Sequence, residues 1–321
     1  MLQQTVVQAV IPHYEHWMNA FPTLKKLSRA QERSMMLQWE GLGYYSRVRN
    51  ICRAARIMVR DHGGRVPGTH SELTALPGIG EYTACAILSL GFNAPYPVLD
   101  ANIRRIGQRL FAVRHWNGQW EKALRSLLEE NIPRERPGEF NESLMELGQT
   151  VCIKSRPRCD ACPLNLICQA YAAGAQNKIP ETRQRSVARK ETRIILLIKE
   201  NMLTKKTAVW LTRRNLGVLK GLWLFPGIDQ SQVDTDLASQ ETIKRNAEFL
   251  GALPTRTHFY TRFRETLHPV IYRASSRKAD KLVTKLNGKG RWVPLSAAAR
   301  YPLPSVYRRV LGDLETLLKS R

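Results

Sequence analysis

Apolar residues at helical intervals dominate the first half of the chain. A first helix is predicted from residues three or four positions apart, namely Val6, Val10, Tyr14 and Trp17. Pro12 is expected to bend or interrupt it, and the pattern already runs at Met1 with no capping residue ahead of it. Another helix is predicted over residues 139–152, with one face formed by Phe140, Leu144, Leu147 and Val151. No alternating strand pattern appears before residue 190.

The pattern changes in the second half. Residues 171–192 are polar, basic and poor in large apolar side chains, which predicts a linker. After it, residues 193–199 and 208–213 have the composition of strands and are followed by Gly-Leu-Trp-Leu-Phe-Pro-Gly at 221–227. We therefore predict a multidomain protein of the α and α+β classes. Its parts are an all-helical domain over 1–170, a linker over 171–192 and an α+β domain over 193–321.

The chain is strongly basic, with 50 Lys and Arg against 27 Asp and Glu and a formal net charge of +23. Residues 1–170 carry 21 basic and 15 acidic side chains, whereas residues 171–321 carry 29 and 12. Such an excess favours a polyanionic partner. Nucleic acid is the leading candidate, although ribosomal and lipid-surface proteins are also basic.

Composition excludes several classes of protein. No apolar run approaches the ~18 residues that a membrane helix needs, so a membrane-spanning protein is excluded. The first ten residues have no basic region and no cleavage signature, so a secretory signal is not expected. Six cysteines are too few for a disulfide scaffold in a chain of 321 residues. We expect a cytoplasmic protein, associated with the nucleoid if the source is bacterial.

Four of the cysteines are clustered with the spacing C-x6-C-x2-C-x5-C, and these are Cys152, Cys159, Cys162 and Cys168. Zinc sites usually pair two short Cys-x2–4-Cys knuckles, whereas this spacing contains one. A [4Fe–4S] cluster also takes four thiolates, and uneven spacing suits a cube held by a loop. The spacing therefore favours iron–sulfur over structural zinc, and both over four buried free thiols. The intervening Lys154, Arg156 and Arg158 form either a phosphate clamp or a solvated loop.

Two other segments carry candidate chemistry. Pro77, Gly78 and Gly80 form a Leu-Pro-Gly-Ile-Gly turn, in which both glycines permit positive φ and leave backbone amides free to face a phosphate. An ordinary turn between helices has the same composition. Asp100 precedes apolar residues at helical spacing, which predicts a helix N-cap. The helix dipole keeps a carboxylate in that position ionised, which suits a residue that stabilises a developing cation.

In combination these motifs resemble a known family. The turn, the following aspartate and the cysteine spacing look like the DNA base-excision glycosylases related to endonuclease III. More closely, five segments resemble MutY-type adenine DNA glycosylases: MLQQT at 1–5, GLGYY at 41–45, LPGIGEYTA at 76–84, LDANIRR at 99–105 and FNESLMELG at 140–148. GLWLFPG at 221–227 resembles the start of that family's Nudix-like C-terminal domain. The resemblance covers nearly the whole chain and implies a helix-hairpin-helix glycosylase domain with an iron–sulfur loop, then a Nudix-like domain.

The resemblance implies a chemical mechanism. MutY-type enzymes flip out adenine that is mispaired with 8-oxoguanine and cleave its N-glycosidic bond. Adenine leaves readily only when protonated, and the sugar becomes oxocarbenium-like, so two carboxylates are needed. Asp100 matches the carboxylate that stabilises the sugar cation, Asn102 matches its family neighbour, and Glu142 matches a residue that contacts adenine. Tyr82 stands where bifunctional glycosylase/lyases have a Schiff-base lysine, which implies a monofunctional glycosylase.

The resemblance also assigns residues that contact the bases. Leu2 and Val7 match walls of the adenine pocket. Residues inserted at or packed around the 8-oxoguanine site are matched by Gln4, Thr5, Leu42 and Tyr44. An aromatic wedge such as Tyr44 can fill the gap left by a flipped base, although periodicity alone assigns this residue to the core. The implied partner is double-stranded DNA with an A:8-oxoguanine or A:G mispair, bound by a monomer.

The chain departs from the family pattern in three places. The family's proton-donating glutamate lies two positions ahead of the methionine that begins this chain. We therefore expect lesion binding with slow excision, because general acid catalysis contributes roughly 10²–10⁴-fold. The lesion-reading Phe-Ser-His is replaced by Phe263-Arg264-Glu265, where Arg264 can donate to the lesion base and Glu265 brings a negative charge near phosphates. The Nudix box G-x5-E-x7-R-E-x2-E-E does not follow Gly227, so no nucleotide hydrolysis is expected.

Three alternative functions remain open at this point. A catalytically inactive protein that binds mismatched or damaged DNA is favoured by the missing glutamate. An endonuclease III-like lyase that acts on damaged pyrimidines is disfavoured by Tyr82. A hydrolase of the nucleotide pool is disfavoured by the incomplete Nudix box.

Overall fold

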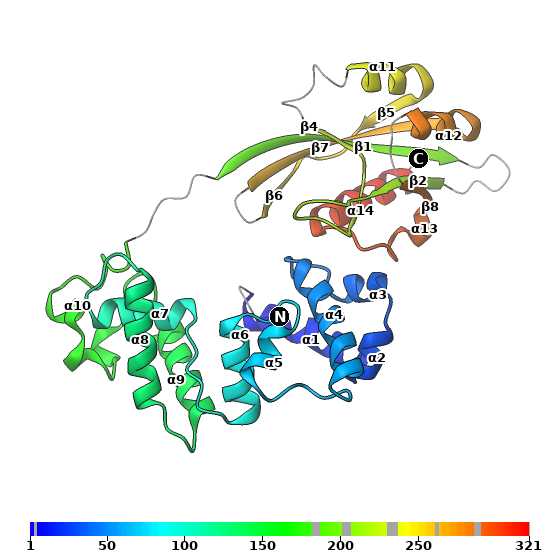
Figure 1. Ribbon diagram of the computed structural model, residues 1–321. Helices are drawn as coiled ribbons and strands as arrows, with labels where there is room; N and C mark the ends of the chain where they lie inside the picture. Colours follow the sequence, from blue (N-terminus) through cyan, green and yellow to red (C-terminus); the bar gives the residue numbers. More distant parts are fainter. Residues whose placement is uncertain are drawn as a thin grey trace. The chain divides into compact units, whose positions relative to one another are not determined.

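The computed structural model describes residues 1–2, 5–181, 187–200, 207–229, 237–260, 263–285 and 290–320. The chain forms two compact units, of which one is Arg53–Gln184 and the other combines Met1–Cys52 with Arg185–Arg321 (Figure 1). These units divide the chain differently from the predicted domains, because the first 52 residues associate with the second half of the chain. Within the ranges given above, no helix is long and apolar enough to span a membrane.

In the unit Arg53–Gln184, the regular secondary structure of the described residues is all helical. Its helices are the end of α4 (Ser46–Asp61), α5 (His70–Ala75), α6 (Glu81–Ala86), a π-helical turn at Ile87–Gly91, α7 (Ala101–Leu110), α8 (Gly118–Asn131), α9 (Pro137–Thr150) and α10 (Gln169–Ala172). Single 3-10 turns at Cys159–Ala161 and Asn165–Ile167 lie in the cysteine loop. The predicted helical class of this part of the chain is confirmed.

Side-chain caps begin three of these helices. Thr69 caps α5, Asp100 caps α7, and Asn117 accepts hydrogen bonds from two backbone amides at the start of α8. The predicted N-cap role of Asp100 is therefore confirmed. Each cap satisfies backbone N–H groups that otherwise have no partner within the helix.

Helix α9 presents a different face to the core from the one that apolar spacing predicts. Its fully buried positions are Pro137, Asn141 and Gly148, whereas the predicted Phe140 and Leu144 are half-buried against the core. That core consists of Cys85, Val98, Leu99, Ile103, Leu124 and Leu128. The face is rotated because one polar and one small residue occupy its centre.

The N-terminal helices are α1 (Val7–Ala20), α2 (Leu24–Arg29) and α3 (Glu32–Gln38). Helix α1 begins at Val7, not at Met1, and it continues through Pro12. Of the predicted apolar face, Val10 and Trp17 are buried, whereas Val6 and Tyr14 are 68% and 55% exposed. The full predicted face is wrong because Val6 lies outside the helix.

The second part of the chain forms an eight-stranded mixed sheet. Its two long strands, β1 (Ala188–Glu200) and β7 (Phe263–Ser275), run parallel over their whole length. The shorter strands are β2 (Thr207–Arg213), β3 (Trp223–Leu224), β4 (Gly227–Asp229), β5 (Glu248–Ala252), β6 (Arg256–Tyr260) and β8 (Gly290–Pro294). Strand β1 begins inside the predicted linker, and α10 occupies the start of that segment.

Both faces of β1 are buried, which explains its unbroken apolar run. Ile194, Leu196 and Ile198 belong to one apolar cluster, which includes residues of α14 (Ser305–Lys319). Ile195 and Leu197 belong to another, which includes residues of α11 (Leu237–Asn246) and α12 (Ser276–Lys285). Figure 1 shows α14 on one side of the sheet and the other two helices on the opposite side. A strand that is buried on both faces can be apolar at every position, without the alternation of polar and apolar residues that a half-exposed strand shows.

Arginines fix the N-terminal helices to the sheet within the same compact unit. The Arg308 guanidinium on α14 donates to both Glu40 carboxylate oxygens at 2.8 and 2.5 Å, and to the Tyr301 carbonyl at 2.8 Å. Arg33 donates to the Arg300 carbonyl at 2.8 Å. These bonds explain why residues 1–52 form a unit with the C-terminal half.

We expect Arg308→Ala to lower the free energy of unfolding by about 2 kcal/mol, because it leaves the half-buried Glu40 carboxylate and the Tyr301 carbonyl without their partner. Chemical denaturation followed by circular dichroism measures this. The control is Arg309→Ala, at the exposed neighbouring position, with an expected loss below about 0.5 kcal/mol. Equal effects of the two substitutions would contradict the assignment.

Candidate active site and metal centre

Asp100 is held in one orientation at the start of α7. Its Oδ1 accepts a hydrogen bond from the Ile103 backbone amide at 2.7 Å, and its Oδ2 accepts one from the Asn102 side-chain amide at 2.8 Å. The carboxylate is half-exposed, so one side of it faces away from the helix core. The first bond is the helix cap that the sequence predicts, and the second is a contact that the structure adds.

Tyr82 lies close enough to Asp100 for the two to interact. It is the second residue of α6 and is 36% exposed. Partial burial raises the pKa of its phenol, and the Asp100 carboxylate adds to this rise because it disfavours a second negative charge. The structure thus brings together a carboxylate and a phenol that stays neutral at physiological pH.

A chain of hydrogen bonds leads from Asp100 to the cysteine loop. Asn102 Oδ1 accepts from Arg105 Nη2 at 3.0 Å. The same guanidinium donates to the carbonyls of Gly148 at 2.5 Å and Cys152 at 2.8 Å. Partial burial lowers the pKa of Arg105, and the nearby Cys152 opposes this. One face of α7 therefore connects the aspartate to α9 and to the first cysteine.

Gly148 allows α9 to approach this face of α7. A Cβ at this position would lie 2.5 Å from the Asn102 Cβ, far inside van der Waals contact. The clash would push Asn102 along α7, and Asn102 holds Asp100 Oδ2. The absence of a side chain at Gly148 is thus a geometric condition for the position of the carboxylate.

Asn141 fixes the segment that leads into Asp100. Its side chain is fully buried, accepts from the Val98 amide and donates to the Tyr96 carbonyl, both at 2.9 Å. The adjacent Glu142 is exposed, as its position opposite the apolar face predicts. The same short stretch of α9 thus carries one buried anchor and one accessible carboxylate.

The four clustered cysteines are free and half-buried. Burial raises the pKa of the Cys159 thiol, and three neighbouring cysteines, namely Cys168, Cys152 and Cys162, contribute to this rise. This mutual influence means that the four thiols converge on one region. Among the described residues, however, the set of ligand atoms within 4.8 Å of one another is His70, Glu81 and Cys85, not the four thiols. Four thiolates in one loop can hold either a zinc ion or an iron–sulfur cluster.

Arg109 holds the cysteine loop against α7. It is only 2% exposed, and its Nη1 donates to the Cys152 sulfur at 3.2 Å and to the Ile153 carbonyl at 2.7 Å. It also donates to the Lys154 carbonyl at 3.1 Å and to the Ile179 carbonyl at 2.8 Å. The loop is thus attached to the same helix that Asp100 begins.

The predicted phosphate-binding residues are on the surface. Lys154, Arg156 and Arg158 are exposed on the cysteine loop. In the turn between α5 and α6, Gly78 has φ of +82°, which favours glycine, whereas Gly80 is extended with φ of −98°. Gly78 thus uses the positive φ that glycine permits, whereas Gly80 is the N-cap of α6.

Several predicted base-contacting residues lie in the other compact unit. Leu2 and Val7 are 60% and 50% exposed, and Thr5 is half-buried. Tyr44 is 44% exposed with φ of +46°, and the Arg47 guanidinium lies 5.0 Å from its ring centre. Its predicted assignment to the core from periodicity is therefore wrong. Gln4 is outside the described residues.

Leu42 is only 7% exposed and belongs to the core of the N-terminal helices. The resemblance places it among residues inserted at or packed around the 8-oxoguanine site, and this assignment stays a prediction.

The triplet Phe263-Arg264-Glu265 begins β7. Glu265 is 5% exposed and accepts a hydrogen bond from the Thr192 hydroxyl at 2.6 Å. The expectation that its charge lies near phosphates is therefore wrong, because alternation along the strand turns this side chain inward. Arg264, one position earlier, is exposed and lies 5.6 Å over the Phe259 ring.

Sequence comparison matches the two halves of the chain to two different domain families. A family model described as "HhH-GPD superfamily base excision DNA repair protein" matches residues 1–134, and a NUDIX domain model matches residues 202–313. The adenine DNA glycosylase of Buchnera aphidicola subsp. Baizongia pistaciae is 31% identical over 317 residues, which cover 98% of this chain and 87% of that protein. The chain belongs to the adenine DNA glycosylase family. The resemblance on which the sequence analysis depends is thereby confirmed.

A mammalian adenine DNA glycosylase is also similar to this chain. The Rattus norvegicus adenine DNA glycosylase is 33% identical over 270 residues, which cover 71% of this chain and 52% of the rat protein. Among solved structures, a thermostable thymine-DNA glycosylase is 26% identical with a TM-score of 0.49, over 54% of this chain and 80% of that one.

Sequence reasoning missed four residues that shape the site: Arg105, Arg109, Asn141 and Gly148. Asn141 and Gly148 lie seven positions apart, which puts them on one face of α9, and that spacing is the signal that could have found them. The two arginines offered no such signal, because a sequence does not show which cations bind backbone carbonyls.

We expect Gly148→Ala to slow adenine release at least tenfold and to destabilise the protein, although alanine normally favours a helix over glycine by about 1 kcal/mol. The reason is the clash with Asn102. Single-turnover adenine release and thermal melting measure the two effects. Gly118→Ala is the matched control, because a Cβ at that helical position meets nothing within 4 Å. Normal activity in Gly148→Ala would refute the packing argument.

Proposed function

We propose that the protein removes adenine paired with 8-oxoguanine or guanine from double-stranded DNA, as a monofunctional glycosylase. The observation that carries the proposal is the Asp100 carboxylate, fixed by two hydrogen bonds at the start of α7 beside Tyr82. Membership of the adenine DNA glycosylase family supports adenine as the base. The high positive charge of the chain supports DNA as the polymer.

Asp100 is suited to stabilise positive charge on the sugar. Each of its oxygens accepts one N–H donor, and each carboxylate oxygen has a further lone pair. As the bond to the base breaks, the deoxyribose becomes oxocarbenium-like, and a fixed carboxylate favours this state electrostatically. Orientation matters because a preorganised charge needs no rearrangement when the cation forms.

Tyr82 makes hydrolysis, not lyase chemistry, the expected outcome. A lyase needs an amine that attacks the sugar and forms a Schiff base, and a phenol cannot do this. With a phenol here and a carboxylate beside it, water is the nucleophile that remains. Asn102 acts as a positioning residue, since its amide holds Asp100 Oδ2.

The remaining site residues have proposed roles in binding the DNA. Glu142 is accessible for a contact with the flipped adenine, and Leu2 and Val7 offer apolar surface for its pocket. Tyr44 and Thr5, together with Gln4, are assigned to the 8-oxoguanine side, where an exposed aromatic ring can stack in the gap left by the base.

Phosphate contacts are assigned to exposed groups on three surfaces. In the turn that Pro77 begins, the exposed Gly78 and Gly80 can offer backbone N–H groups. The cysteine loop offers Lys154, Arg156 and Arg158, and the start of β7 offers Arg264 with Phe263 beside it. Such contacts position the duplex without reading its sequence.

The four cysteines fit a [4Fe–4S] cluster. Their thiols influence one another electrostatically, Arg109 donates to the Cys152 sulfur, and the uneven C-x6-C-x2-C-x5-C spacing suits a cube held by a loop. Cys152, Cys159, Cys162 and Cys168 would hold the cluster as thiolates, and the bound cluster would cross-link the loop. Arg109 and Arg105 then hold that loop against α7 through its carbonyls.

The test of the catalytic assignment is Asp100→Asn. Asparagine also caps helices well, so the fold should persist. Losing the negative charge should slow single-turnover adenine release from an A:8-oxoguanine duplex by roughly 10²-fold or more. Binding of the same duplex should change less than tenfold. Release at the wild-type rate would remove Asp100 from the mechanism, and a duplex with guanine opposite adenine tests the preference for the lesion.

We expect Cys162→Ser to lose most of the bound iron and acid-labile sulfide, about four of each in the unmodified protein. Chemical analysis and visible absorption measure both. Cys52→Ser is the control, because Cys52 is a buried cysteine outside the loop. One zinc ion per chain in place of iron would contradict the cluster assignment.

A further inference from the structure

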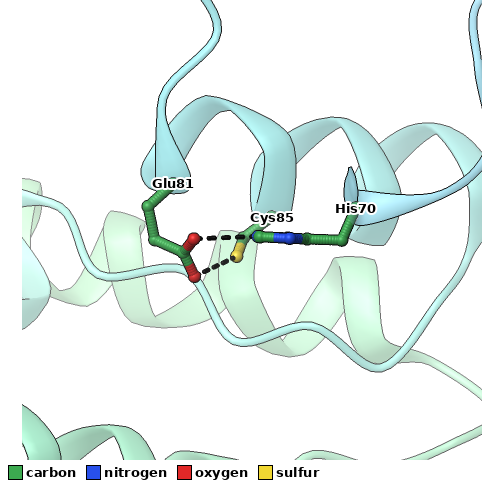
Figure 2. A group of neighbouring side chains, drawn as sticks. All are labelled: His70, Glu81 and Cys85. Carbon is green, nitrogen blue, oxygen red and sulfur yellow. Dashed lines mark hydrogen bonds and ion pairs between the residues drawn. The ribbon is translucent and has the colours of Figure 1, made fainter. Parts of the chain in front are cut away.

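A second group of metal-binding side chain types occurs away from the cysteine loop. His70 begins α5, and Glu81 and Cys85 lie one turn apart on α6. Each residue offers one ligand atom, and the three ligand atoms all lie within 4.8 Å of one another. Figure 2 shows the three side chains pointing toward one another from the two helices of the hairpin. The proposed glycosylase chemistry uses none of them.

The contacts within this group are already polar and close. His70 Nε2 lies 2.8 Å from Glu81 Oε2, and the Cys85 thiol lies 3.5 Å from Glu81 Oε1. Cys85 is only 2% exposed, whereas the side chains of His70 and Glu81 are 33% and 53% exposed. The group therefore has a buried sulfur at its base and two ligands at the surface, through which an ion can enter.

We propose that His70, Glu81 and Cys85 form a binding site for a divalent ion of the zinc class. Imidazole nitrogen, thiolate sulfur and carboxylate oxygen are the ligands that zinc takes in proteins. Calcium and magnesium are disfavoured because they need several oxygen ligands, and this site offers one carboxylate. Three protein ligands leave a fourth position for water.

The geometry needs only a small adjustment to hold the ion. Zinc lies about 2.0–2.3 Å from such ligands, which places tetrahedral neighbours roughly 3.5 Å apart. The separations of up to 4.8 Å must therefore shrink by about 1 Å. The exposed Glu81 and the half-exposed His70 can rotate, while buried Cys85 stays in place.

Neighbouring side chains contact all three ligands. The His70 ring stacks on Tyr96, with centroids 5.8 Å apart and planes 9° apart. Arg125 Nη1 forms an ion pair with Glu81 Oε1 at 3.2 Å and also interacts with the Cys85 thiol, while Glu81 Oε2 faces the histidine. A carboxylate that binds an ion through one oxygen and an arginine through the other is oriented by that second contact.

The site adjoins the turn that we assign to phosphate binding, since Glu81 directly follows Gly80. Bound metal would neutralise the carboxylate beside that turn and connect α5 to α6. Stronger DNA binding in the presence of zinc is the expected consequence. This consequence rests on the proposed function, whereas the metal site itself does not.

The test is a titration of the cluster-loaded protein with Co²⁺ in the absence of DNA. One equivalent should bind with a thiolate-to-cobalt absorption band, and Zn²⁺ should displace it. Cys85→Ser should abolish the band, and His70→Ala should weaken cobalt binding at least tenfold. The matched controls Cys52→Ser and His115→Ala change a cysteine and a histidine outside the group and should leave binding unaltered.

Two results would overturn the proposal. One is the absence of a thiolate band in the wild-type protein. The other is a band that persists in Cys85→Ser, which would assign the ion to other cysteines. If Cys85→Ser fails to fold, judged by circular dichroism, His70→Ala at the exposed rim decides. Because no DNA is present, failure here leaves the glycosylase proposal untouched, and adenine release at the wild-type rate by Asp100→Asn leaves this one untouched.

Discussion

The two hydrogen bonds that hold the Asp100 carboxylate at the start of α7 are the constraint on which the active site depends. The backbone bond from Ile103 is available to any capping aspartate, but the bond from Asn102 exists only while Asn102 keeps its place. That place is set by Arg105 on one side and by the bare backbone of Gly148 on the other. The carboxylate to which we assign the catalytic charge is thus positioned by packing between two helices.

Helix α7 combines two tasks that the sequence presents separately. Its first residues orient the carboxylate, and Arg105 and Arg109 bind the carbonyls of the cysteine loop. Buried arginines that satisfy several carbonyls at once give a rigid attachment, because each lost bond would leave a polar group without a partner. Helix α7 therefore holds both the cysteine loop and the Asp100 carboxylate, although the loop and Asp100 are far apart in the chain.

Local chemistry was predictable from the sequence, and packing was not. The Asp100 cap followed from its place before an apolar helical repeat, and the run from Ile194 to Ile198 indicated a strand. Apolar spacing could not show that Asn141 and Gly148 form the buried centre of α9, because it scores polar and small residues as interruptions. Nor could it show that Glu265 points into the sheet, which depends on the register of β7. Those errors all concern partners that are distant in sequence.

A double-mutant cycle between Asp100 and Asn102 tests the central claim most directly. Single-turnover adenine release is measured for the wild type, Asp100→Asn, Asn102→Ala and the double variant. If Asn102 acts only by orienting the carboxylate, its substitution slows the wild type but adds nothing once the charge on Asp100 is gone. Effects that multiply independently would contradict the account, since Asn102 would then contribute to catalysis by a route that does not pass through Asp100.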